Sequence, residues 1–122
     1  MQAEQMPPEV FEELVRDALD ALPAWVSEIV AEIAVTVADE PAPGESPDGI
    51  LLLGRYHGTP RTRHGGRVPG SLPDVITLYR LPILSVCPRP EDVGPKVLKV
   101  LGHEVGHAMG LEEHRLRELG WS

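Results

Sequence analysis

The sequence has little cysteine, few aromatic residues and no apolar run long enough to cross a membrane. Its single cysteine, Cys87, excludes an internal disulfide and a metal site built on several cysteines. Cys87 ends the apolar segment 83–87, so we expect a buried, unreactive thiol. Aromatic residues make up 4% of the 122 residues, whereas glycine and proline number 12 and 13. This composition excludes a long coiled coil and favours a small domain with many turns.

Positive charge is also scarce: the chain has 11 lysines and arginines and 19 acidic residues, which gives a net charge of −8. Residues 1–48 contain twelve acidic residues and Arg16 as the single cation, whereas residues 49–90 contain six arginines and the single acid Asp74. A chain this acidic is a poor candidate for general nucleic-acid binding, which depends on phosphate neutralisation. The arginine-rich middle is either a local site for an anion or partner, or a solvated loop that balances the acidic half.

The length predicts a single domain over residues 1–122, with an apolar content of 42% that suffices for one core. Residues 1–6 lack the basic start and apolar stretch of a signal peptide. We therefore expect a cytoplasmic protein without a membrane partner.

Hydrophobic periodicity predicts helices at both ends of the chain and strands between them. Pro7 and Pro8 precede an amphipathic helix that ends near Pro23. The other expected elements are a short helix over 25–33, strands over 34–38, 50–56 and 75–80, a helix from 90 or 95 to 109, and a tail helix over 112–121. This order lacks regular βαβ alternation and indicates an α+β fold with a small mixed sheet.

Two of the expected strands carry a prediction about their position. Segment 50–56 is apolar almost throughout, so we expect it to be central and buried. Pro82 either limits strand 75–80 to an edge of the sheet or ends it. The segment 57–72 between them is rich in glycine and proline and is expected to form a long loop.

The motif with the clearest chemistry is His103-Glu104-Val105-Gly106-His107 on the last long helix. Histidines four residues apart lie on one helix face, where two imidazoles can reach one zinc ion. Glu104 lies beside that face and suits the general base of an HExxH enzyme. The alternative is two surface histidines that share this spacing by chance. Gly110 follows three residues after His107 and can return the chain toward the metal by adopting a positive φ.

The sequence leaves open which of several neighbouring residues supplies the third metal ligand. Glu113 stands at the position that the HExxHxxGxx pattern gives its third ligand. His114 is the next residue, and imidazole is a common zinc ligand. Glu112 or solvent are the remaining choices. Spacing favours Glu113.

The chain resembles the compact bacterial zincin-like metallopeptidases. The likeness rests on the zinc motif and on residues 11–15, 21–23, 37–41, 53–58, 72–80 and 118–121. It implies a minimal zincin-like fold, in which a small mixed sheet packs against an N-terminal helix and a C-terminal HExxH helix, with an edge strand beside the cleft. Members often have histidine where this chain has Ala108 and aspartate where it has Glu113, and the Met-turn of larger relatives is missing.

The resemblance implies a zinc-dependent metallopeptidase with a peptide or protein substrate. Zn²⁺ would be held by His103, His107 and Glu113, and Glu104 would take a proton from a metal-activated water. A substrate strand could pair along residues 75–80, with an oxyanion donor from Tyr79, Tyr56 or an arginine of segment 55–67. The alternative is a zinc-binding interaction or regulatory module with little or no hydrolytic activity, which the small size of the chain favours.

Overall fold

The computed structural model describes residues 2–58 and 74–121. Short 3₁₀ turns at Ala3–Gln5, Ala24–Val26 and Pro90–Asp92 accompany the helices and strands of this part. The elements are α1 (Pro8–Ala21), α2 (Ser27–Val30), β1 (Ile33–Ala38), β2 (Gly54–His57), β3 (Asp74–Tyr79), α4 (Arg80–Ser85), α5 (Val93–Ala108) and α6 (Glu113–Leu119). The predicted α+β class is confirmed, and residues 59–72 of the expected loop lie outside the described residues.

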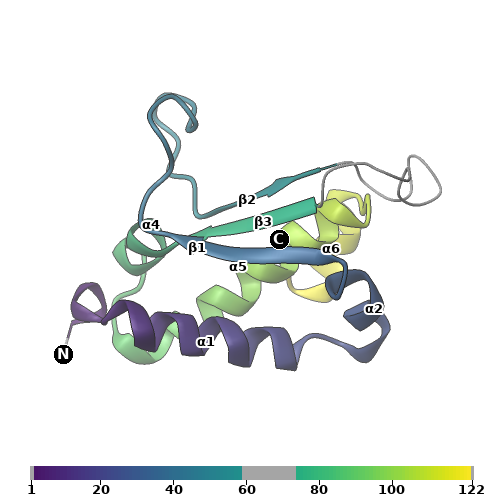
Figure 1. The fold of residues 1–122 in the computed structure, drawn as a ribbon, viewed down its shortest axis with the longest axis horizontal. Helices are drawn as coiled ribbons and strands as arrows, with labels where there is room; N and C mark the ends of the chain where they lie inside the picture. Colours follow the sequence, from purple (N-terminus) through teal and green to yellow (C-terminus); the bar gives the residue numbers. More distant parts are fainter. Residues whose placement is uncertain (1, 59–73, 122) are drawn as a thin grey trace.

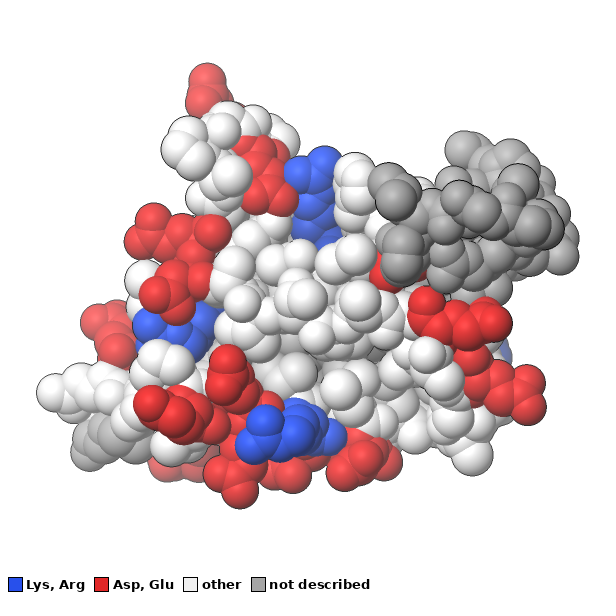
Figure 2. Space-filling model, in the orientation of Figure 1, with Lys and Arg blue, Asp and Glu red and all other residues white. Residues whose placement is uncertain are grey.

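Helix α1 forms because its sequence separates apolar from acidic residues at helical spacing. Pro8 is its first residue, where an amide hydrogen has no partner inside the helix. Phe11, Val15 and Ala18 are buried on one face. The opposite face carries acidic side chains, which gather along the α1 side of the molecule with few basic ones (Figure 2). No helix among the described residues is long and apolar enough to cross a membrane.

The three described strands form one mixed sheet in the order β1-β3-β2 (Figure 1). β1 is parallel to β3, and β2 is antiparallel to β3. Strand β3 is therefore central, and its residues Ile76 and Leu78 are fully buried. The interpretation of segment 75–80 as an edge strand is wrong, whereas the alternative that the strand ends before Pro82 is confirmed.

The apolar segment 50–56 also differs from its prediction. Strand β2 contains only Gly54–His57 and lies at the edge of the described sheet, while Ile50 and Leu51 are 58% and 55% exposed. The expectation of a central, buried strand is wrong because an apolar run does not specify which surface covers it. Leu53 lines a groove beside α5 instead of the interior of the sheet.

Helix α4 follows β3 directly and is not among the elements that the sequence predicts. Pro82 is the third residue of this helix, and proline is tolerated there because amides of the first turn have no intrahelical acceptor. Ile83 and Leu84 are buried and pack into the core. Cys87 follows the helix and is buried, as predicted, and burial raises the pKa of its thiol.

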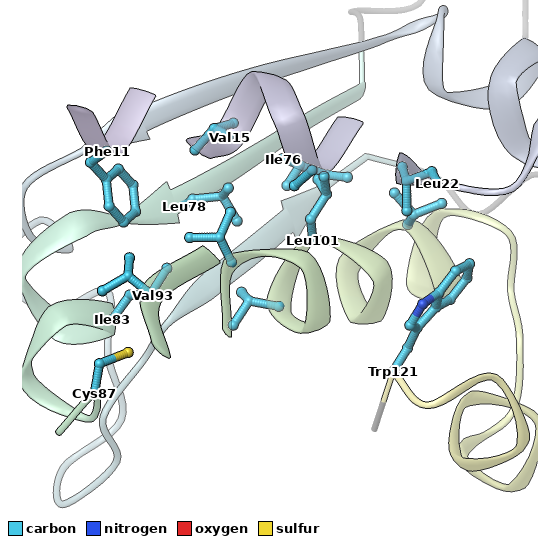
Figure 3. Packing of buried hydrophobic residues seen from close by; sticks show 14 of the residues in the cluster. Phe11, Val15, Leu22, Ile76, Leu78, Ile83, Cys87, Val93, Leu101 and Trp121 are labelled. Carbon is cyan, nitrogen blue, oxygen red and sulfur yellow. The ribbon is translucent and has the colours of Figure 1, made fainter. Parts of the chain in front are cut away.

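Helix α5 is packed on several sides by the rest of the fold (Figure 3). It contacts α1 as well as β2 and β3. Its residues Val93 and Leu101 belong to the same hydrophobic cluster as Phe11 of α1 and Leu78 of β3. Because α5 is held by both the helix and the sheet, the histidines near its C-terminal end project from a fixed support.

Candidate metal centre

The two motif histidines lie together on one face of α5. Their ring centroids are 4.4 Å apart, with the rings nearly perpendicular. One ligand atom each from His103, Glu104 and His107 lies within 4.8 Å of the others, and this is the group of potential metal ligands found among the described residues. The helical spacing of the motif thus brings two imidazoles and the carboxylate of Glu104 together.

A backbone carbonyl fixes the orientation of His103. Its Nδ1 lies 2.9 Å from the carbonyl oxygen of Trp121, 18 residues away. A carbonyl can only accept a hydrogen bond, so Nδ1 carries the hydrogen in the neutral ring and Nε2 keeps a free lone pair. Metal-binding histidines are commonly held in this way by a partner on the second nitrogen. No local pattern in the sequence predicts this contact, because Trp121 and His103 are joined only by the fold.

Glu104 is buried beside His107, which is partly open to solvent. The Glu104 side chain is 9% exposed, and its Oε1 lies 3.3 Å from Nδ1 of His107, whose side chain is 44% exposed. The hydrogen bond to Glu104 raises the pKa of His107 despite partial burial, and the charge of Glu113 raises it further. A buried carboxylate requires a nearby positive charge or hydrogen-bond donors. Glu104 therefore makes the site favourable for a cation.

Gly110 reverses the chain after α5, as the sequence predicts. It has a φ of +71° and donates its backbone N–H to the carbonyl of His107 at 3.0 Å. The next amide, that of Leu111, donates to the carbonyl of Gly106 at 2.9 Å. These two bonds form a Schellman motif, which requires a residue that tolerates a positive φ. The reversal starts α6 at Glu113, beside the end of the histidine helix.

The candidate third ligands lie outside the group of three close ligand atoms. Glu113 is near enough for its charge to act on His107. His114 has its Nδ1 3.3 Å from Oε2 of Glu112, and both of these side chains are largely exposed. In the described structure His114 thus contacts Glu112, whereas Glu113 acts on His107 through its charge and not through a contact.

Each candidate oxyanion donor that the structure describes has a partner of its own. The Tyr56 hydroxyl donates to Oδ2 of Asp74 at 3.1 Å. The Tyr79 hydroxyl donates to Glu45, and Arg55 forms an ion pair with the same carboxylate at 2.9 Å. Burial and the bond to Glu45 raise the pKa of Tyr79 to about 12. The other arginines of segment 55–67 lie outside the described residues.

A groove of about 310 Å³ opens beside the histidine pair. His103 and Glu104 form part of its wall, Leu53 and Gly54 face them, and Trp121 contributes its side chain. A volume of this size accommodates a large amino-acid side chain or a small ligand. The buried carboxylate and one imidazole therefore border a space that a substrate can enter.

Comparison with known families adds a match that covers most of the chain. The model of the zincin-like metallopeptidase family matches residues 30–121. The chain belongs to this family. A search of curated proteins gives no match. The match confirms the predicted family and the zincin-like fold, because it spans the sheet, the HExxH helix and α6.

The side chains of this zincin-like protein suit the metal that the family implies, which is usually zinc. Zinc prefers imidazole nitrogen and carboxylate oxygen or thiolate ligands in a tetrahedral arrangement. The His103–Glu104–His107 group supplies the first two types, and the carbonyl of Trp121 leaves Nε2 of His103 available. The group can therefore hold a metal ion.

Replacing Gly102 by alanine is expected to weaken zinc binding about 10- to 100-fold, the range seen when a partner of a ligand is disturbed. A Cβ at Gly102 would lie 2.5 Å from Cγ of Trp121, so the ring and the carbonyl that orients His103 must move. Gly94 on the same helix is the matched control, since a Cβ there makes ordinary contact at 3.7 Å. The affinities are measured by competition with a chromogenic chelator. Equal affinities for Gly102→Ala and Gly94→Ala would contradict this role of Trp121.

Proposed function

We propose that this zincin-like protein is a zinc-dependent peptidase. The observation that carries the proposal is the convergence of two imidazoles and a buried carboxylate within 4.8 Å, with the second nitrogen of one imidazole already bound. This convergence lies beside a groove rather than in the closed core. The Glu104 side chain is only 9% exposed. Ionisable side chains are rarely this buried, and a purely structural role would not require one at this position.

In the proposed mechanism His103, His107 and Glu113 would hold the metal. When bound, zinc would activate a water molecule and polarise a peptide carbonyl. Glu104 accepts the proton of the attacking water through its carboxylate and passes it to the leaving amine. Trp121 keeps His103 in the tautomer with a free Nε2 through its backbone carbonyl.

A substrate strand is better placed along β2 than along residues 75–80. β3 already pairs with β1 and β2, so its backbone groups are occupied on both sides. This pairing excludes the predicted addition of a substrate strand to residues 75–80. β2 is the edge strand of the described sheet, and its first residue, Gly54, lines the groove with His103. An extended peptide beside β2 would therefore run past Glu104.

The choice between Glu113 and His114 gives a direct prediction. Glu113→Gln is expected to weaken zinc binding at least 10-fold, because it removes a charged ligand that acts on His107. His114→Gln is the matched control and is expected to leave the affinity unchanged, since His114 contacts Glu112. Both affinities are measured by chelator competition. If zinc binding is weakened by His114→Gln and not by Glu113→Gln, His114 is the third ligand. If neither variant changes the affinity, the third ligand is Glu112 or solvent.

The hydrogen bonds of the two tyrosines considered as oxyanion donors favour a second function. Tyr56 and Tyr79 donate their hydroxyls to Asp74 and Glu45, so neither points to a substrate carbonyl in the described structure. A protein that binds zinc and a peptide without efficient hydrolysis fits these contacts. It would act as an interaction or regulatory module.

The two functions are separated by a cleavage profile. The zinc-loaded protein is incubated with a library of unstructured peptides, and products are identified by mass spectrometry. Cleavage that stops with a chelator and returns with added zinc supports the peptidase. Stoichiometric zinc without any cleaved peptide supports the interaction module and contradicts the peptidase.

A further inference from the structure

The groove beside the histidine pair carries an unusual local charge. The chain has only two lysines, Lys96 and Lys99, although its net charge is −8. Both line this groove together with His103 and Glu104. Residues 96, 99 and 103 follow each other at intervals of three and four, so they share a face of α5. The scarce ammonium groups of the chain are thus concentrated at one end of the candidate active site.

Neither lysine forms an ion pair with an acidic side chain in residues 2–58 and 74–121, although Asp92 precedes Lys96 by four residues and both charges act on Cys87. By contrast, Arg55, Arg80 and Arg115 all form ion pairs, with nitrogen–oxygen distances of 2.9 Å. Lys96 is half-buried and Lys99 is exposed. Lysine side chains in such positions lay their methylene groups on apolar surface and keep the ammonium group in water. The two charges are therefore available to an anionic group that enters the groove.

The rest of the groove wall is apolar. Leu52 and Leu53 come from the segment before β2, Val100 from α5, and Trp121 from the tail. A volume of about 310 Å³ between these side chains accommodates a large aliphatic or aromatic residue. The groove combines this apolar wall with a cationic end.

Helix geometry fixes how far the cationic end lies from the reacting position. With a rise of about 1.5 Å per residue, Lys99 and Lys96 precede His103 by about 6 and 10 Å along the axis of α5. An extended peptide advances about 3.3 Å per residue. A peptide that runs along α5 with its scissile bond level with His103 therefore brings its second or third residue from that bond to the lysines.

We propose that this groove selects peptides with a large apolar residue next to the scissile bond and a carboxylate two or three residues away. The inference rests on the proposed peptidase function and specifies its substrate class. The carboxylate can come from an aspartate or glutamate side chain or from the C-terminus of the peptide. Both sources present the same anion to Lys96 and Lys99.

The test measures binding without cleavage, with the zinc-loaded Glu104→Gln protein as the common background. The probes are fluorescent six-residue peptides with one leucine and, two residues before or after it, glutamate, glutamine or lysine, all with blocked ends. One further glutamine peptide has a free C-terminus. When Lys99→Glu is added to this background, the affinity for a carboxylate probe is expected to fall about 5-fold more than the affinity for the neutral glutamine probe. The affinity for the lysine probe is expected to rise. The probe that responds identifies the source of the carboxylate.

Arg16→Glu is the matched control, because it changes the net charge equally at an exposed position of α1 and is expected to alter no affinity. Zinc stoichiometry and circular dichroism verify that each variant is folded. Equal effects of Lys99→Glu on all probes, or no binding of any probe, would overturn the inference. Wild-type cleavage without preference for acidic peptides would overturn it while leaving the peptidase intact. Acidic binding without wild-type cleavage would keep the groove and refute the peptidase.

Discussion

Replacing both His103 and His107 by alanine is expected to reduce bound zinc from about one ion per chain to background, since a site of this kind needs three protein ligands. The two imidazoles lie with their ring centroids 4.4 Å apart on one helix face. Without them only the carboxylates of Glu104 and Glu113 remain, and these cannot hold the ion in competition with water. Zinc is measured by mass spectrometry of the metal after dialysis. Each single variant is expected to bind zinc far more weakly than the wild type.

His57→Ala is the matched control for this loss. His57 ends β2, is exposed, and is not part of the close ligand group. Its variant is expected to keep the full zinc content. Added zinc should raise the melting temperature of the wild type and of His57→Ala, because a ligand bound only by the folded state stabilises it, and should leave that of the double variant unchanged. Stoichiometric zinc in the double variant would place the metal elsewhere.

Replacing Glu104 by glutamine is expected to lower the rate of peptide cleavage about 10²- to 10⁴-fold while zinc remains bound. Glutamine has nearly the same shape as glutamate, so the buried position beside His107 is kept and only the proton acceptor is lost. Initial rates are compared on a peptide found by the library. Glu12→Gln on the exposed face of α1 makes the same chemical change far from the histidines and should have no effect.

The two readouts of Glu104→Gln separate a base from a ligand. Glu104 belongs to the close ligand group, so a role in holding the metal would appear as a loss of zinc. A loss of activity with full zinc content is the result expected for a general base. Cleavage that continues at the wild-type rate would remove Glu104 from the mechanism.

The features of the fold and of the candidate site that depend on local sequence could be predicted. The i, i+4 spacing of His103 and His107 fixes their common face, and Gly110 fixes the reversal after α5 through its positive φ. The apolar periodicity of α1 likewise depends on residues within a few turns of each other. These three features follow from backbone geometry over a few residues, so none of them needs knowledge of distant segments.

The features that depend on contacts between distant segments of the chain could not be predicted. The pairing of Thr36 with Thr77 joins residues 41 apart, and no local pattern specifies which of two apolar strands takes the centre of the sheet. The carbonyl of Trp121 reaches His103 across 18 residues through a turn and a helix. Pro82 indicates the end of a strand but does not by itself indicate the start of a helix, although the first turn of a helix tolerates proline.

The contact between Trp121 and His103 makes the tail and the histidine pair a thermodynamically linked system. Trp121 also stacks on Trp25, with ring centroids 6.5 Å apart, so a segment before the sheet shares in this linkage. Any metal that binds through Nε2 of His103 favours the docked tail, and a docked tail favours that metal by the same factor. A partner that displaces Trp121 would therefore weaken metal binding without touching the metal, and the affinity for zinc would report how firmly the tail is bound.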